Sequence, residues 1–219
     1  MTDQPLAAKA SRSRAVDRLI NFSDAVVAVA VTVLVLPLVD IGAPQGGQSV
    51  WQLILDNGGQ IFAFLFTFYV VAIMWQAHNR ILNGIRDYDP AIFWLNTTWL
   101  VLIVMLPWFS AMYGESQSET DGKGASGVGL LYWGAMAAVS LLGSAISWHL
   151  RRNPALLVAG EADGGRVGRM TVLRGPVFAA YFLFIGVVFE FAPAIATWLP
   201  LGIIPLSIWL RPGPPEQDT

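Results

Sequence analysis

Few side chains in this sequence could carry chemistry. The chain has no cysteine, which excludes a thiolate nucleophile, a disulfide and a cysteine-based metal site. His78 and His149 are its only histidines, and no metal-binding spacing such as HExxH surrounds them. Together with Asp24 they form no arrangement of a nucleophile with a base. We therefore predict no catalytic residue, no metal site and no cofactor, and hence a protein that is not an enzyme.

Polar residues gather near the ends of three apolar segments. The sequence RLINFSD opens the first segment and contains Asp24. A carboxylate inside an apolar segment costs several kcal/mol unless it is paired. Its partners are expected among residues at the same depth: Arg18, Trp75, His78, Asn79 and Asn96. Two interpretations remain open. The network could only hold three helices together, or Asp24 and His78 could form a proton-sensitive gate or relay.

The apolar segments that carry these residues are long enough to cross a membrane. Charged residues make up 13% of the chain, against about 25% in a soluble domain. A helix needs roughly 20 apolar residues to cross a hydrocarbon core of about 30 Å. Six stretches qualify: 19–39, 50–78, 90–113, 128–148, 172–191 and 193–210. We predict an all-α integral membrane protein with six transmembrane helices.

Two of these helices have distinctive sequence signals. The third follows Asp89-Pro90, which is the pattern of an N-cap followed by a proline in the first helical turn. The sixth is the shortest and contains Pro200 and Pro205. Because proline lacks a backbone N–H, we expect the sixth helix to be kinked or to lie partly in the membrane interface.

The distribution of Lys and Arg indicates the orientation, because cytoplasmic loops are enriched in these residues. With the N-terminus in the cytoplasm, every Lys and Arg except Lys123 falls on the cytoplasmic side of the six spans. We predict two cytoplasmic termini, an N-terminal tail over 1–17, a transmembrane domain over 18–211 and a C-terminal tail over 212–219. The formal charge of −2 gives no reason to expect nucleic acid as a partner.

The first helix has a second face. Asp24 and Val29 are five residues apart, which places them about 140° apart around a helix of 3.6 residues per turn. An apolar stripe with one hydroxyl runs along the Val29 side: Phe22, Ala25, Val29, Thr32, Val33 and Leu36. Taken alone, such a stripe is more typical of a packing face than of a pore.

The run from Arg18 through Phe22 and Ser23 to Asp24 resembles the RxxxFSD signature of the transmembrane protein 175 family, the lysosomal potassium channels. The likeness is to the bacterial, single-repeat branch of that family. Two later segments agree with it: Trp75 with the sequence HNR at 78–80, and the sequence WLN at 94–96 with Leu100 and Pro107. The specific part of the resemblance covers about residues 18–108, and the C-terminal half agrees only in hydropathy.

The resemblance implies a potassium-permeable channel in which four copies surround a pore lined by the first helix. The family has no TVGYG filter, and its hydrophobic constriction matches Val29, Thr32 and Leu36, with Val33 as the next neighbour. A structural role is implied for Arg18, Phe22, Ser23 and Asp24, which would hold the first helix against the second and third. Val29 is one carbon smaller than the family's usual Ile or Leu, which predicts a wider or less selective ring. The permeant species would be monovalent cations, and the location a bacterial plasma membrane.

A different class of function is also compatible with the sequence. A proton-coupled secondary transporter could use the Asp24 and His78 network, although inverted repeats and broken helices at the midplane, which are typical of carriers, are not evident in the first five spans. Stoichiometry distinguishes the two. A symmetric homotetramer with the first helix on its axis favours a channel, and a monomer with an internal cavity favours a carrier.

Overall fold

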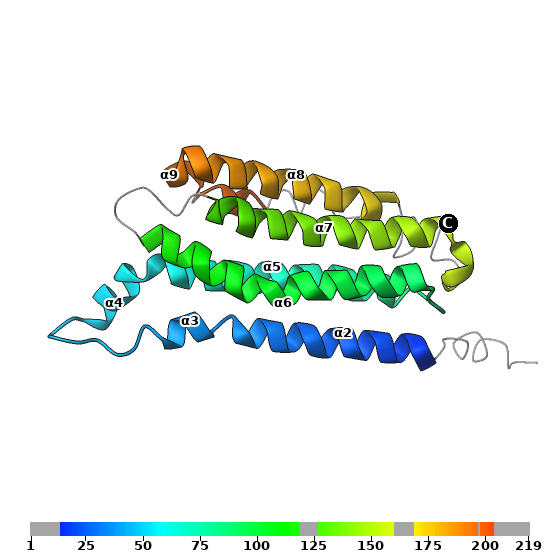
Figure 1. The fold of residues 1–219 in the computed structure, drawn as a ribbon, viewed down its shortest axis with the longest axis horizontal. Coiled ribbons are helices and arrows are strands. Elements are labelled where there is room, and N and C mark those ends of the chain that lie inside the picture. The colour runs from blue at the N-terminus through cyan, green and yellow to red at the C-terminus, as the bar shows by residue number, and fades with distance from the viewer. Residues whose placement is uncertain (1–13, 119–126, 160–168, 197, 204–219) are drawn as a thin grey trace, which may run out of the picture.

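The structure, a computed structural model, describes residues 14–118, 127–159, 169–196 and 198–203. Within these residues the protein is almost entirely helical, and five segments are long and apolar enough to cross a membrane. The elements in chain order are α2 (Arg14–Val33), α3 (Leu36–Val39), α4 (Val50–Asp56), α5 (Gly58–Leu82), α6 (Pro90–Ser118), α7 (Val128–Arg152), η1 (Pro154–Leu156), α8 (Arg169–Phe191), α9 (Pro193–Ala196) and η2 (Leu199–Gly202). The long helices run side by side along the molecule (Figure 1).

The first two predicted spans are each interrupted near the same end of the molecule. The first is continuous to Val33 and resumes at Leu36 as α3. We attribute the interruption to Pro37, which has no N–H to donate to the preceding turn. The second is divided at Asn57, which caps α4 and precedes α5. The predicted start of the third helix is confirmed: Asp89 Oδ1 accepts a hydrogen bond of 2.9 Å from the Ile92 N–H.

The predicted sixth span has a different form in its described part. Residues 193–203 contain the four-residue helix α9 and the 3₁₀ turn η2 instead of one long helix. Pro193 and Pro200 stand at the starts of these short elements, where a missing N–H is tolerated. The remainder of the predicted span, including Pro205, lies outside the described residues. A sixth crossing therefore stays a prediction.

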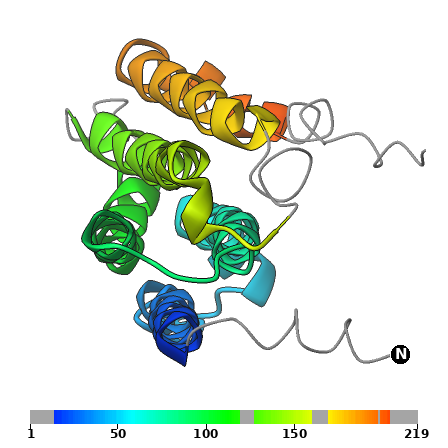
Figure 2. The ribbon, with the colours of Figure 1, turned by 90° about the vertical axis from the view of Figure 1, so that its right-hand side faces the viewer.

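The helices form a bundle in which α2 lies at one edge. Viewed along its length, the bundle has α5 and α6 between α2 and the α7–α8 pair (Figure 2). The centre is filled by large side chains such as Trp99, Trp133 and Phe182, all with almost no exposed surface. The Tyr113 and Tyr132 rings stack with centroids 4.6 Å apart. Thr67 Oγ1 lies 2.7 Å from the Tyr132 hydroxyl oxygen, which pairs two buried polar groups inside the bundle.

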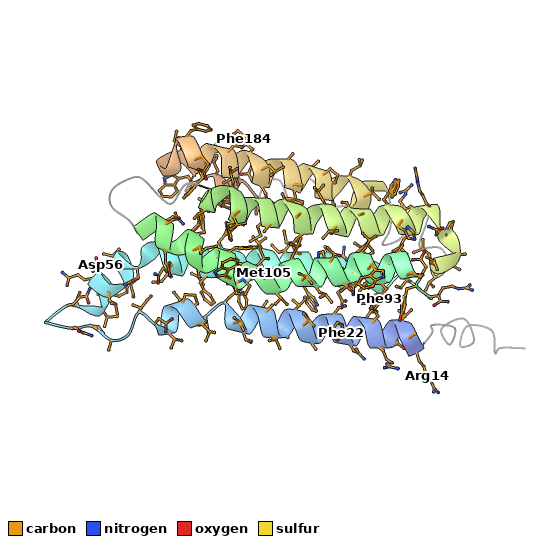
Figure 3. All side chains as sticks on the ribbon, in the orientation of Figure 1. Arg14, Phe22, Asp56, Phe93, Met105 and Phe184 are labelled. Atoms are coloured by element: carbon orange, nitrogen blue, oxygen red, sulfur yellow. The ribbon has the colours of Figure 1, made fainter. Side chains whose placement is uncertain are left out.

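Arginine side chains mark one end of this bundle, which we call the arginine-rich end. Arg14 begins α2, Arg80 lies in the last turn of α5, and Arg151 with Arg152 ends α7. These helix ends all lie at the side of the molecule where Arg14 is labelled (Figure 3). At the same end the backbone pairs Ile85 with Leu157. These four arginines thus lie at the helix ends and not along the apolar middle of the helices.

His149 helps to close the arginine-rich end. Its Nε2 lies 2.7 Å from Asp89 Oδ2, so the last turn of α7 is joined to the N-cap of α6. Burial alone raises the pKa of Asp89, but hydrogen bonds from the Ile92 N–H and from His149 outweigh this effect, and the pKa of Asp89 lies below its ordinary value. His149 is therefore a structural residue that joins two helix ends.

Candidate functional site

The Asp24 carboxylate joins α2 to α5. Its Oδ1 accepts a hydrogen bond of 2.7 Å from the indole N–H of Trp75 and one of 3.0 Å from the Asn79 amide. Asn83 donates to Asn79 Oδ1 at 2.6 Å, which leaves the NH₂ group of Asn79 directed at Asp24. Two of the partners expected from the sequence, Trp75 and Asn79, therefore bind this carboxylate.

Ser23, Asn96 and His78 form a second cluster that joins α2 to α6 and α5. Asn96 Nδ2 donates to Ser23 Oγ at 3.0 Å, and Asn96 Oδ1 lies 2.7 Å from His78 Nε2. Because the amide oxygen can only accept, His78 carries its proton on Nε2. The imidazole also lies against the Trp99 ring, with centroids 3.9 Å apart. All three polar side chains of this cluster are buried.

Asp24 and His78 belong to separate clusters. Among the described residues, the hydrogen bonds of Asp24 lead to Trp75 and Asn79, and those of His78 lead to Asn96 and Ser23. No hydrogen bond within this described part links the two clusters directly. The arrangement fits a joint between three helices better than a proton relay from Asp24 to His78.

Arg18 and Phe22 lie outside both clusters. Both side chains are exposed, and Arg18 makes no hydrogen bond or ion pair with another described residue. Arg18 and Asp24 are six positions apart, which places them about 120° apart around the helix. The structure thus does not bring Arg18 to the carboxylate, although the sequence placed both residues at a similar depth.

The face of α2 opposite the bundle is apolar and exposed. Val29 keeps 62% of its surface accessible, and Thr32 and Val33 are exposed beside it. Leu36, at the start of α3, keeps 55%. The Thr32 hydroxyl donates to the Val29 carbonyl at 2.7 Å, so its polar group is satisfied within the helix. The opposite side of α2 is buried in the bundle: Val16, Leu19, Ile20, Ser23, Val27 and Ala30. The first helix therefore presents the predicted stripe away from its own subunit.

Two contributors to the site were not singled out from the sequence. Asn83, the C-cap residue of α5, orients Asn79, and Trp99 packs on His78 from α6. The signal for Asn83 was its i, i+4 spacing from Asn79. Trp99 stands three residues after Asn96, the spacing of neighbours on one helix face. Trp99 lies in an apolar stretch that is equally typical of core packing.

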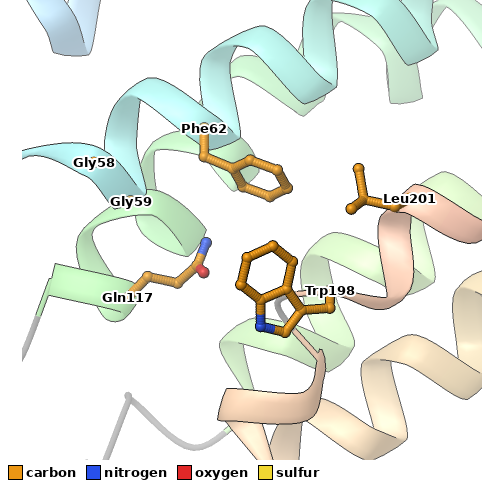
Figure 4. Close-up of a pocket in the computed structure, with 6 residues that line it drawn as sticks. All are labelled: Gly58, Gly59, Phe62, Gln117, Trp198 and Leu201. Atoms are coloured by element: carbon orange, nitrogen blue, oxygen red, sulfur yellow. The ribbon is translucent and has the colours of Figure 1, made fainter.

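A pocket lies at the end opposite the arginine-rich end, away from these clusters. It encloses about 400 Å³ between the start of α5, the end of α6 and the η2 segment (Figure 4). Its lining residues are Gly58, Gly59, Phe62, Gln117, Trp198 and Leu201. None of the predicted site residues lines it. Within the described residues, no group of three or more His, Cys, Asp or Glu could hold a metal ion.

The similarity to known proteins includes the segment that contains α2, α5 and most of α6. The family model described as endosomal/lysosomal potassium channel TMEM175 matches residues 18–107. A potassium channel of Streptomyces collinus is 30% identical over 179 residues, which cover 80% of this chain and 84% of that protein. The chain belongs to the TMEM175 family. The predicted resemblance is confirmed, and TMEM175 proteins are ion channels rather than enzymes.

Two other TMEM175 relatives extend the comparison. A crystal structure from Chamaesiphon minutus, described as a lysosomal potassium-selective channel TMEM175 homolog, matches with a TM-score of 0.72 at 21% identity. The match covers 91% of this chain and 100% of that chain, which establishes the fold. The Gallus gallus protein, named an endosomal/lysosomal proton channel, is 27% identical over 85% of this chain but only 36% of its own length. The chain therefore corresponds to about a third of the length of this vertebrate relative. Its family and its five long apolar helices make it a multi-pass membrane protein.

Proposed function

We propose that this protein is a potassium-permeable cation channel of a bacterial plasma membrane, formed by four copies that surround an axis lined by α2. The observation that carries the proposal is the two-sided character of α2. One side is held by buried contacts and by the Asp24 and Ser23 clusters, and the other presents exposed Val29 and Val33, with exposed Leu36 following at the start of α3. A helix so firmly joined on one side is well suited to hold a narrow ring of side chains in register.

In this assembly Val29, Thr32, Val33 and Leu36 form the constriction. A ring of apolar side chains gates by dewetting, and it favours the ion that loses its hydration shell at lower cost. Potassium is larger and less tightly hydrated than sodium, so such a ring favours potassium. The Asp24 and Ser23 clusters then have a structural role, because they fix the rotation of α2 and thus the direction of the ring.

The proposal extends to the topology of the subunit. The arginine-rich end is cytoplasmic, as expected from the excess of positive residues in cytoplasmic loops. Residues 18–211 form the channel domain with six crossings and with tails over 1–17 and 212–219 in the cytoplasm. The permeant cation is the only ligand that the channel needs, and no cofactor takes part. Similarity to proteins named potassium channels in two bacteria supports the choice of ion.

The experiment is ion flux through liposomes that contain the purified protein, with potassium, sodium and protons tested in parallel. We expect a potassium flux larger than the sodium flux. A dominant proton flux would instead align this chain with relatives named proton channels. The absence of any flux from correctly folded protein would contradict the proposal.

A matched pair of variants tests the constriction itself. Val29→Ala removes two methyl groups from each copy of the predicted ring, so we expect a larger conductance and a smaller preference for potassium over sodium. Val187→Ala makes the same chemical change on α8, where the side chain is also exposed, and should leave both quantities unaltered. Equal behaviour of the two variants would show that Val29 does not line the narrow part of the pore.

A further inference from the structure

The short helix α4 exposes apolar side chains that nothing in the described bundle covers. Trp51 and Leu55 keep 76% and 77% of their surface accessible, and Val50 and Ile54 are exposed beside them. None of the seven residues of α4 is buried. Such a contiguous apolar surface on one element indicates contact with an apolar environment.

The two faces of α4 are sharply different. At 3.6 residues per turn the four exposed apolar residues occupy a sector of about 140°, the half-buried Leu53 lies about 60° beyond its edge, and Ser49, Gln52 and Asp56 lie on the other side. The polar groups satisfy one another. Ser49 and Gln52 form a reciprocal capping box, and Gln48 Nε2 donates to Asp56 Oδ2 at 2.8 Å. The polar side chains of this segment thus form hydrogen bonds with one another and need no partner outside it.

The position of α4 identifies its apolar partner. A helix of seven residues is not stable in water by itself, so burial of its apolar side must support it. Asn57 alone separates α4 from α5, which is one of the membrane-crossing helices. Figure 1 shows α4 at the end of α5 that is opposite the arginine-rich end, beyond the close-packed part of the bundle. Because α5 is long enough to cross the membrane, we expect the boundary between headgroups and acyl chains near its end, and tryptophan is enriched at such boundaries.

We propose that α4 is an interfacial helix that lies in the membrane surface with Val50, Trp51, Ile54 and Leu55 among the acyl chains and Asp56 in water. Its lipid chemistry is that of a neutral headgroup, because α4 contains no Lys or Arg and its one charged residue is Asp56. Binding depends on buried apolar area rather than on attraction to anionic lipid. The helix anchors the start of α5 whichever ion the protein conducts.

The natural absence of cysteine permits a direct test by spin labelling. A nitroxide is attached to Leu55→Cys or to Asp56→Cys in the full chain in phosphatidylcholine vesicles, and its collisions with oxygen and with a water-soluble nickel chelate are measured. These adjacent positions have nearly equal depth but point about 100° apart. We expect oxygen to dominate at position 55 and the nickel chelate at position 56. Phe184→Cys on α8 is the lipid-facing reference and exposed Asp40→Cys is the aqueous one.

Each other result overturns the proposal. Access of the nickel chelate to position 55 would place α4 in water, and protection from both reagents would place its apolar side against another copy of the chain. A second series, in vesicles with added phosphatidylglycerol, tests the lipid chemistry. An oxygen preference at position 55 that appears only with this anionic lipid would overturn the neutral-headgroup assignment. Collision rates are measured without ion flux, so failure here is distinct from failure of the channel proposal.

Discussion

Asp24 is the residue on which the joint between α2 and α5 depends. In Asp24→Ala, the Trp75 indole N–H and the Asn79 amide lose their acceptor. Trp75 is exposed and Asn79 is half-buried, so water can replace part of each bond, and each lost hydrogen bond costs about 0.5–1.5 kcal/mol. We expect a lower thermal unfolding temperature in detergent. The unfolding temperature of Asp24→Asn, which keeps one acceptor oxygen, should lie between those of Asp24→Ala and the natural protein. An unaltered unfolding temperature in the alanine variant would show that the carboxylate does not hold the joint.

Gly175 permits a close approach of α8 to α7. A Cβ at this position would collide with the Ser144 hydroxyl and with the backbone carbonyl of Ser140. Because a backbone carbonyl cannot rotate aside, Gly175→Ala should destabilise the pair by about 1–3 kcal/mol, the usual range for overpacking. The measurement is again thermal unfolding in detergent.

The matched control for this change is Gly143→Ala in α7. A Cβ at Gly143 meets no atom within 4 Å, and alanine is the better helix former by about 1 kcal/mol. We therefore expect Gly143→Ala to be neutral or stabilising. If both alanine variants unfolded at the same temperature, close packing at Gly175 would not limit the stability of the pair.

At the scale of single elements, the sequence predicted helix positions well and helix interruptions poorly. The start of α6 was predicted correctly because Asp89-Pro90 is a local signal that needs no tertiary information. The division at Asn57 was not predicted, because the polar residues at 56–60 are equally compatible with the end of one span. Whether a helix continues through such a stretch depends on whether its backbone groups are satisfied elsewhere, as in the capping box of α4.

The candidate site shows the same limit. Depth along a helix follows from residue number, so the sequence placed Asp24, Asn79 and Asn96 at one level, and the structure brings their α-helices together there. The choice of partner depends on the relative rotation of the helices and on rotamers, which sequence spacing does not define. Asp24 binds Trp75 and Asn79, whereas Asn96 binds Ser23 and His78.

The rotation of α2 gives Arg18 a different expected role. Arg18 and Val29 are 11 residues apart within α2, which is three turns plus about 20°, so they lie on nearly the same side of the helix. If four copies surround an axis on that side, their guanidinium groups ring the cytoplasmic mouth and repel cations. Arg18→Gln should then raise single-channel potassium conductance at low salt, and the difference should shrink as salt shortens the screening length from about 30 Å at 0.01 M to about 3 Å at 1 M.

Arg151→Gln is the control for Arg18. This arginine is also exposed at the arginine-rich end, but it lies at the end of α7 rather than on α2. Its replacement should leave the conductance unaltered at both salt concentrations. A salt-independent effect of Arg18→Gln, or an equal effect of the two changes, would remove Arg18 from the mouth of the pore.

At the scale of the whole molecule, the exposed apolar surfaces of α2 and α8 have different expected surroundings. Both helices carry large exposed side chains, among them Val29 on α2 and Leu183 on α8. The two helices lie on opposite sides of the bundle (Figure 2). If copies of the chain meet around α2, the α8 side faces lipid. Composition cannot distinguish these surfaces, because lipid and a neighbouring subunit both favour apolar residues.

Cysteine cross-linking distinguishes them in a chain that has no natural cysteine. Val29→Cys places a thiol on each copy next to the proposed axis, so a short bifunctional thiol reagent should link pairs of copies in a large excess of lipid. Leu183→Cys should remain unlinked under the same conditions, because its thiols point outward and the copies are diluted in the membrane. Linkage through position 183 without linkage through position 29 would place the subunit contacts on α8. The constriction would then have no basis, since only a central α2 brings four Val29 side chains close enough to exclude water.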